Sequence, residues 1–202
     1  MEITEDYDKR SLNALIRKSI LDNWDRMALT DMGGMNYQYK DVALWIEKLH
    51  IIFEEAGVGK GDKVAICGKN SSNWAVVFLS CLTAGVVAVP ILHEFKADTI
   101  HHLVNHCDAK LLFVDAAIWE DLDERLLPGL TGAIYISEFG MPLSRSERLT
   151  KARNNINTLF GKRYPYSFTK ENVDYFHDMP EDLAIINYTS GSTGMSKGVM
   201  LP

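Results

Sequence analysis

A run of small hydroxyl and glycine residues near the end of the chain has the composition of an anion-binding loop. Residues 189–198 read Thr-Ser-Gly-Ser-Thr-Gly-Met-Ser-Lys-Gly. Glycines allow positive φ angles and a close approach of the backbone to a ligand, so successive amide groups can point at phosphate oxygens. The hydroxyls of Ser190, Ser192 and Thr193 add donors, and the ammonium group of Lys197 adds a positive charge. The sequence therefore predicts a grip for a polyphosphate.

Two common nucleotide-binding loops do not fit this run. The P-loop, Gly-x-x-x-x-Gly-Lys-[Ser/Thr], counted from Gly191, requires glycine where Ser196 stands and a hydroxyl where Gly198 stands. The dinucleotide fingerprint Gly-x-Gly-x-x-Gly follows none of the strands that we expect. A plain turn remains as the alternative to a phosphate grip, because many glycine- and serine-rich loops after a strand bind nothing.

Residues 188–199 resemble the signature of the adenylate-forming (AMP-binding) superfamily, which includes acyl-CoA synthetases, peptide-synthetase adenylation domains and luciferases. That signature reads Tyr-Thr-Ser-Gly-[Ser/Thr]-Thr-Gly-x-Pro-Lys-Gly-Val, and the chain departs from it at Ser196, which replaces the proline. Proline would fix one φ angle and remove one amide, so we expect the change to alter loop stiffness more than the anion donors. The similarity extends upstream to about residue 28, through segments 57–66, 83–90, 105–110 and 112–115.

The resemblance implies a binding site for the β- and γ-phosphates of ATP. Its members would be Thr189, Ser190, Gly191, Ser192, Thr193, Gly194, Lys197 and Gly198. Thr193 and Lys197 would act in catalysis, while a carboxylate attacks the α-phosphorus and pyrophosphate leaves. Such chemistry depends on positioning and charge stabilisation, which suits glycines, hydroxyls and one lysine. Mg²⁺ is expected to accompany the ATP.

The resemblance further implies an acyl-CoA synthetase similar to the long-chain fatty acid–CoA ligases, which would form acyl-AMP from a fatty acid and then a thioester with coenzyme A. No residue of the chain indicates which acid is used. The family's adenosine pocket, most of its acyl pocket and its C-terminal lid domain lie in sequence beyond this chain, so we expect an N-terminal portion that is inactive alone. Two alternatives remain: a non-catalytic nucleotide-binding or interaction module, and a P-loop-like ATPase that releases ADP instead of AMP.

The residues before the loop alternate between helix and strand patterns. An amphipathic helix over 11–24 and a hairpin over 27–39 come first, and a helix over 41–56 then starts at Asp41 as N-cap and stops at Gly57. The further expected strands are 63–67, 86–89 (closed by Pro90), 110–114, 133–137 and 183–188, and the further helices are 73–84, 96–105 and 116–127. Strand–helix–strand units imply parallel pairs. The sequence predicts an α/β fold with a mostly parallel, doubly wound sheet and flanking helices.

The division that we expect has three parts. Residues 1–137 form an N-terminal α/β subdomain, and residues 179–202 begin the next segment with the phosphate loop. Between them, over 138–178, periodicity fades and polar, basic and turn-forming residues become frequent, which is typical of a mobile connection.

Composition excludes several other classes of protein. The chain of 202 residues is 47% hydrophobic and has a net charge of −6, from 21 basic and 27 acidic residues, so it is globular and offers no basic field for nucleic acid. Cys67, Cys81 and Cys107 lack Cys-x-x-Cys spacing, which favours a reducing cytoplasm. The acidic N-terminus predicts no signal peptide, and the apolar run 86–92 is too short to span a bilayer, so membrane contact is at most peripheral. The sequence does not indicate an oligomeric state.

Four histidines gather around one expected helix: His93, His101, His102 and His106. His102 and His106 share a face at i, i+4, but position 103 is leucine instead of the glutamate of a zincin. A metal site would need further ligands from elsewhere in the fold, so we predict surface histidines and no metal ligand. The basic residues between 145 and 153 are similarly predicted to form a solvated face.

Overall fold

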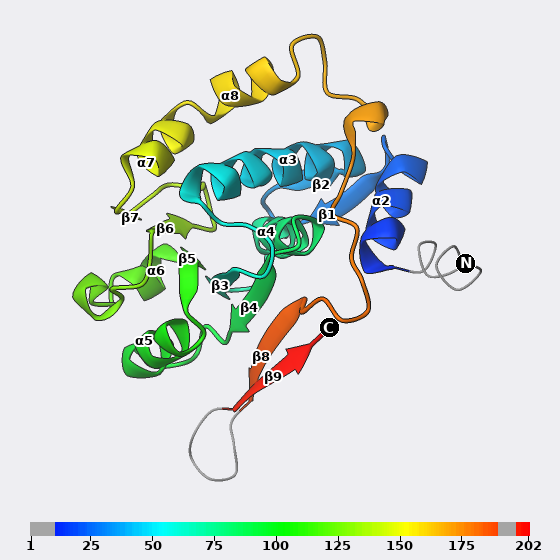
Figure 1. Ribbon diagram of the computed structural model, residues 1–202. Helices are drawn as coiled ribbons and strands as arrows, with labels where there is room; N and C mark the ends of the chain where they lie inside the picture. Colours follow the sequence, from blue (N-terminus) through cyan, green and yellow to red (C-terminus); the bar gives the residue numbers. More distant parts are fainter. Residues whose placement is uncertain (1–10, 190–196) are drawn as a thin grey trace.

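The computed structural model describes residues 11–189 and 197–202 and has a seven-stranded sheet at its centre (Figure 1). The strand order is β7-β6-β5-β3-β4-β8-β9. The five inner strands are parallel, and the edge strands β7 and β9 are antiparallel to their neighbours. The strands are β3 (Lys63–Cys67), β4 (Val87–Ile91), β5 (Ala109–Val114), β6 (Gly132–Tyr135), β7 (Leu143–Ser144), β8 (Ile185–Thr189) and β9 (Lys197–Leu201). This confirms the predicted fold class.

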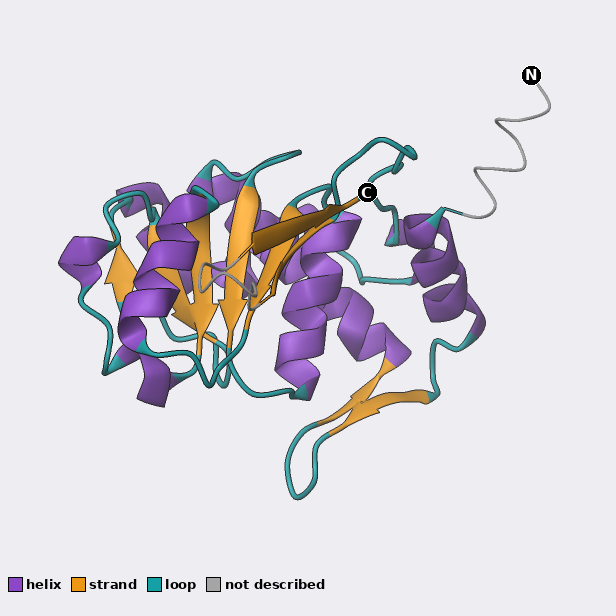
Figure 2. Ribbon diagram, turned by 90° about the horizontal axis from the view of Figure 1, so that it is seen from below, coloured by secondary structure: helices purple, strands orange, loops and turns teal. Residues whose placement is uncertain are grey.

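Helices cover both faces of the sheet (Figure 1, Figure 2). One face carries α3 (Tyr39–Ala56), α4 (Ser72–Thr83), α7 (Glu147–Asn154) and α8 (Ile156–Arg163), and the other carries α5 (Ala97–His106) and α6 (Ala116–Trp119). The chain moves from β3 to β4 in one direction along the sheet and from β4 past β3 to β5 in the other. Because parallel crossovers are right-handed, this reversal places α4 and α5 on opposite faces.

Each face of the sheet has its own apolar core. Val64 and Ile66 of β3 belong to the core under α3 and α4, whereas Ala65 and Cys67 belong to the core under α5. All four are fully buried. Strands buried on both faces read as continuous apolar runs, which is why the sequence located β3 with its observed bounds.

The N-terminal elements match the predictions except at one helix start. Helix α2 (Leu12–Asp22) is capped by Ser11, and β1 (Met27–Thr30) pairs with β2 (Asn36–Gln38) in a hairpin that stands apart from the main sheet (Figure 2). The prediction that Asp41 caps α3 is wrong, because the N-cap is Gln38. Asp41 is instead the third helical residue of a capping box, and its carboxylate accepts a hydrogen bond from the Gln38 amide at 2.8 Å.

Two further expectations need correction. The helix predicted over 116–127 is the short α6 followed by a 3₁₀ turn, η1 (Glu124–Leu126). Asp123 diverts the backbone there, because its amide donates to His101 Nε2 at 3.0 Å and its carboxylate accepts from the Arg125 amide at 3.0 Å. Pro90 does not close β4, which continues to Ile91.

The segment 138–178, predicted to be a mobile connection, contains β7, α7, α8 and the 3₁₀ turn η2 (Lys170–Asn172). Leu149 of α7 is fully buried, and the rings of Phe160, Tyr164 and Phe168 pack with centroids 5.0–5.5 Å apart. Both helices have eight residues, and their few apolar side chains give little periodicity to read. The division of the chain near residues 137 and 178 stays a prediction.

Within the part of the chain that the structure describes, no helix combines the length and the apolar character needed to cross a membrane.

Candidate functional site

The described ends of the predicted phosphate loop lie opposite one another in the antiparallel β8–β9 ladder. Thr189 pairs with Lys197, and Tyr188 pairs with Gly198. Side chains at facing positions of an antiparallel pair have Cβ atoms about 4.5–5.5 Å apart. Thr189 and Lys197 are both exposed, so the ammonium and hydroxyl groups share one open face at the mouth of the loop. The other predicted site residues, Ser190, Gly191, Ser192, Thr193 and Gly194, lie outside the described residues.

This mouth lies at the carboxyl end of β8, which runs parallel to β4. Ligands of open α/β sheets bind outside the carboxyl ends of the strands, so Thr189 and Lys197 lie at the expected edge. Side chains alternate along the strand. Ile186 and Tyr188 face the core under α5 and are buried, while Thr189 faces the opposite side.

Gly198 has a packing reason to lack a side chain. A Cβ at this position would lie 3.0 Å from Cγ2 of Ile186 and 3.2 Å from Cε1 of Tyr188. The Tyr188 ring therefore lies directly under the Gly198 backbone. The predicted contact of Gly198 with a phosphate stays a prediction.

The side chain of Tyr188 contacts a histidine at the C-terminal end of α5. Its hydroxyl lies 2.6 Å from Nδ1 of His106, the last residue of α5, and the two rings meet edge-on with centroids 5.7 Å apart. Burial, followed by the nearby Cys107 and Asp108, raises the pKa of Tyr188 to about 12, so the hydroxyl keeps its proton near neutral pH. His106 is exposed, as the sequence predicts, but its contact with Tyr188, 82 positions away, has no local signal in the sequence.

The histidines do not form a metal centre. The ring of His102 lies 5.7 Å from that of His106. Among residues 11–189 and 197–202, no group of three or more His, Cys, Asp and Glu side chains is placed to hold a metal ion. The prediction of a surface position is wrong for His101, which is buried because it packs inward from α5, and its Nε2 accepts a hydrogen bond from the Asp123 amide.

The direction of the crossovers reverses between β3 and β5, and open α/β sheets often bind ligands at such a point. The Lys69 amide donates to Oδ2 of Asp115 at 2.8 Å. A Cβ on Gly68 would lie 2.7 Å from Oδ1 of Asp115 and 2.5 Å from Cδ1 of Ile136. Gly68, Asp115 and Ile136 thus pack closely at this point, whereas the described ends of the predicted phosphate loop lie at the β8–β9 mouth, which remains the candidate site.

A cavity of about 230 Å³ lies at the opposite end of β8. Its lining includes Val86, Phe176 and Ala184, which precede or flank the amino-terminal ends of β4 and β8. The five residues of β8 separate it from Thr189 by roughly 16 Å at the usual rise of a strand. The cavity is not part of the candidate site.

The basic residues in and near α7 are bound to other groups of the chain and lie apart from the β8–β9 mouth. Arg145 donates to three backbone carbonyls and Arg153 to one. Arg148 and Lys151 pair with glutamate side chains. These four cations therefore do not converge on an anion site.

Residues 17–202 match the AMP-binding enzyme family, and the matched region includes β8, β9 and the segment between them. The chain belongs to the AMP-binding enzyme family. Long chain acyl-CoA synthetase 3 of Arabidopsis thaliana is 29% identical over 167 residues, which cover 81% of this chain and 24% of that relative. Probable 4-coumarate–CoA ligase 3 of Dictyostelium discoideum is 26% identical over 198 residues, which cover 93% of this chain and 34% of that relative.

Solved structures of AMP-binding enzymes have the same fold. The anthranilate CoA ligase AuaEII, in complex with anthranoyl-AMP, superposes with a TM-score of 0.74 at 20% identity, over 93% of this chain and 34% of that chain. The fold of this chain therefore agrees with that solved structure. This AMP-binding enzyme chain therefore spans about a quarter to a third of the length of the proteins that it matches.

Proposed function

We propose that this AMP-binding enzyme chain is the N-terminal portion of an ATP-dependent carboxylate–CoA ligase. The observation that carries the proposal is the nearly complete family signature over 188–199, whose described ends, Thr189 and Lys197, are cross-strand neighbours at the carboxyl edge of the sheet. A loop that leaves and re-enters the sheet at facing positions can present its amides and hydroxyls to one anion.

The proposed phosphate site consists of Thr189, Ser190, Gly191, Ser192, Thr193, Gly194, Lys197 and Gly198. A carboxylate oxygen of the acid attacks the α-phosphorus of ATP, the bond from that phosphorus to the bridging oxygen breaks, and pyrophosphate leaves with the negative charge. The ammonium group of Lys197 offsets this charge, and the hydroxyl of Thr193 donates to a phosphate oxygen. No side chain acts as a nucleophile.

Mg²⁺ fits this site as an ion that ATP brings with it. Magnesium usually keeps several waters and binds through substrate phosphates with one or two carboxylates. When bound, it would neutralise phosphate charge beside Lys197.

We propose a fatty acid as the carboxylate, followed by transfer of the acyl group to coenzyme A. Support comes from relatives named as long-chain acyl-CoA synthetases, and the relative named as a 4-coumarate–CoA ligase makes an aromatic acid the competing choice. We expect the 202-residue chain to be inactive alone, because it spans only about a quarter to a third of the length of these relatives.

The test is acid-dependent exchange of labelled pyrophosphate into ATP, measured on the longer protein that contains this chain. A panel of fatty and aromatic acids would identify the substrate class. Lys197→Ala should lower exchange by about 100-fold or more, because one preorganised charge on the leaving group is lost. Lys162→Ala removes another exposed lysine, on α8, and should leave pyrophosphate exchange unchanged.

Each alternative function predicts a different result. Acid-independent release of ADP would favour a P-loop-like ATPase. No exchange with any acid, from folded wild-type protein, would refute the ligase and favour a non-catalytic module.

A further inference from the structure

Few backbone hydrogen bonds hold β8 to its parallel neighbour. The two strands pair at Ala88 and Ile185, and the Ala88 amide donates to the carbonyl of Ala184, the residue before β8, at 2.9 Å. In a parallel ladder, successive amides alternate between the two neighbouring strands. The Val87 amide points toward β3, so the next amide that would face β8 belongs to Pro90. Proline has no N–H, so the last residues of β8 receive no donor from this position.

The side chain of Tyr188 links β8 to α5 beyond the point where the β4–β8 pairing ends. It is buried, with 5% of its surface exposed, and its hydroxyl lies 2.6 Å from Nδ1 of His106. His106 is the last residue of α5, and that helix is fixed to the sheet by the buried Ile100 and Leu103. The contact therefore ties a rigid helix to the residue immediately before Thr189.

The same ring supports the other end of the loop. Gly198 faces Tyr188 across the ladder, and its backbone lies so close to the ring that an added Cβ would be 3.2 Å from Cε1. Lys197 is the next residue toward the loop. Both described ends of the segment, Thr189 and Lys197, are thus one residue away from a backbone position set by Tyr188.

We propose that His106 is a positioning residue, which acts through Tyr188 to hold Thr189 and Lys197 in place for the triphosphate of ATP. This inference rests on the proposed function, since it assigns a role in the same site. We name the His106–Tyr188 contact the latch. The Tyr188 hydroxyl and Nδ1 of His106 share one hydrogen bond, so loss of His106 would leave a buried hydroxyl without this partner.

The variants separate the hydrogen bond from packing. Tyr188→Phe removes the hydroxyl and keeps the ring, His106→Leu removes the acceptor, and His106→Asn restores an oxygen near the place of Nδ1. His102→Leu is the matched control, because His102 is an exposed histidine one turn earlier on α5, its ring lies beside that of His106, and it is not a member of the latch.

The first measurement is hydrogen exchange of the β8 and β9 amides in the longer protein that contains this chain. Loss of one hydrogen bond should speed their exchange by about 3- to 10-fold in His106→Leu and Tyr188→Phe, with β3 unchanged. His106→Asn and His102→Leu should resemble the wild type. The double variant His106→Leu/Tyr188→Phe should exchange its amides no faster than either single variant, because both substitutions remove the same hydrogen bond.

The second measurement is the KM for ATP in pyrophosphate exchange, at a temperature well below unfolding. The latch predicts a KM raised by about 3- to 10-fold in the same two variants, restored in His106→Asn, with a smaller change in kcat. A merely structural contact would lower the unfolding temperature and leave KM unchanged.

The proposal would be overturned if His106→Leu and Tyr188→Phe changed neither the hydrogen exchange of the β8 and β9 amides nor the KM for ATP. An equal rise of this KM in His102→Leu would also overturn it. If the wild-type protein shows no pyrophosphate exchange with any acid, the proposed function fails and the role in ATP binding falls with it. Hydrogen exchange would then still decide whether the latch holds β8.

Discussion

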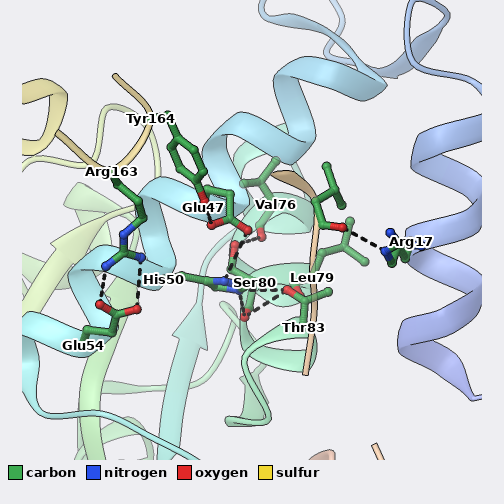
Figure 3. A network of polar contacts seen from close by, with 11 residues as sticks. Arg17, Glu47, His50, Glu54, Val76, Leu79, Ser80, Thr83, Arg163 and Tyr164 are labelled. Atoms are coloured by element: carbon green, nitrogen blue, oxygen red, sulfur yellow. Dashed lines mark hydrogen bonds and ion pairs between the residues drawn. The ribbon is translucent and has the colours of Figure 1, made fainter. Parts of the chain in front are cut away.

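The hydroxyl of Tyr164 should stabilise the fold more at high pH than at low pH, because it donates to a buried carboxylate. Tyr164 follows α8, and its hydroxyl lies 2.7 Å from Oε2 of Glu47 on α3 (Figure 3). Glu47 is 5% exposed. Burial raises the pKa of Glu47, and the bond from Tyr164 opposes this shift. Tyr164→Phe removes only the hydroxyl and keeps the ring packed against Phe160 and Phe168.

The size of the effect follows from the charge of Glu47. A hydrogen bond to a charged group contributes about 1.5–3 kcal/mol to stability and one to a neutral group about 0.5–1.5 kcal/mol. The folded pKa of Glu47 lies above its unfolded value of 4.5, so the stabilising effect of its protonation is fully present below pH 4.5 and is lost as pH rises through the folded pKa. Removing the Tyr164 hydroxyl raises that folded pKa further. The variant should therefore lose about 1 kcal/mol at pH 4 and about 2 kcal/mol at pH 8.

Neighbouring groups do not change this sign. His50 Nδ1 lies 3.8 Å from Oε1 of Glu47, but burial lowers the pKa of His50 to about 4, so the imidazole is neutral over most of the range. Arg163 is hydrogen-bonded to Glu54 and favours the ionised form of Glu47, while Glu54 and Asp174 oppose it. The hydrogen bond to Glu54 raises the pKa of Arg163, so this cation keeps its charge and the sign of the effect follows the charge of Glu47.

The assay is urea unfolding of the 202-residue chain at pH 4, 6 and 8, with the free energy of unfolding taken from the midpoint and slope. Tyr166→Phe is the matched control, because Tyr166 is 99% exposed and its hydroxyl should contribute less than about 0.5 kcal/mol. An equal loss for Tyr164→Phe at pH 4 and pH 8, or no loss at all, would refute the reasoning and show that α8 does not depend on Glu47.

Two further predictions concern backbone conformation and thiol chemistry. Gly85→Ala should destabilise the chain by about 2 kcal/mol or more, because Gly85 has φ +68° and a Cβ would meet the Phe176 ring at 2.8–3.0 Å. Gly161→Ala, inside α8 with no atom within 4 Å of the added Cβ, should instead raise the free energy of unfolding by about 0.5–1 kcal/mol in the same assay. Burial raises the pKa of Cys67 to about 12 and that of Cys107 to about 11, and it raises the pKa of Cys81 as well. Iodoacetamide at pH 8 should therefore modify the three thiols much faster in urea than in the folded chain, as read by mass spectrometry, and rapid labelling of folded Cys107 would contradict the burial argument.

The alternation of helices and strands could be predicted from the sequence because its signals are local. Buried parallel strands read as apolar runs, which located β3 with its observed bounds, and Gly57 marked the end of α3 because it takes a φ of +70° there. The phosphate-loop signature is local in the same sense, since its residues follow one another along the chain.

Elements whose stability comes from distant partners could not be predicted in this way. Helices α7 and α8 have weak patterns of their own, and they form where Leu149 reaches the core and Tyr164 reaches Glu47, 117 positions earlier. The contact between His106 and Tyr188 has the same origin. A pattern in the sequence reports the preference of a segment for its own conformation, whereas these contacts exist only after the sheet has brought distant segments together. The sequence thus determined the order of most elements and the residue types of the predicted phosphate loop, and the tertiary structure decided which distant side chain contacts Tyr188 beside it.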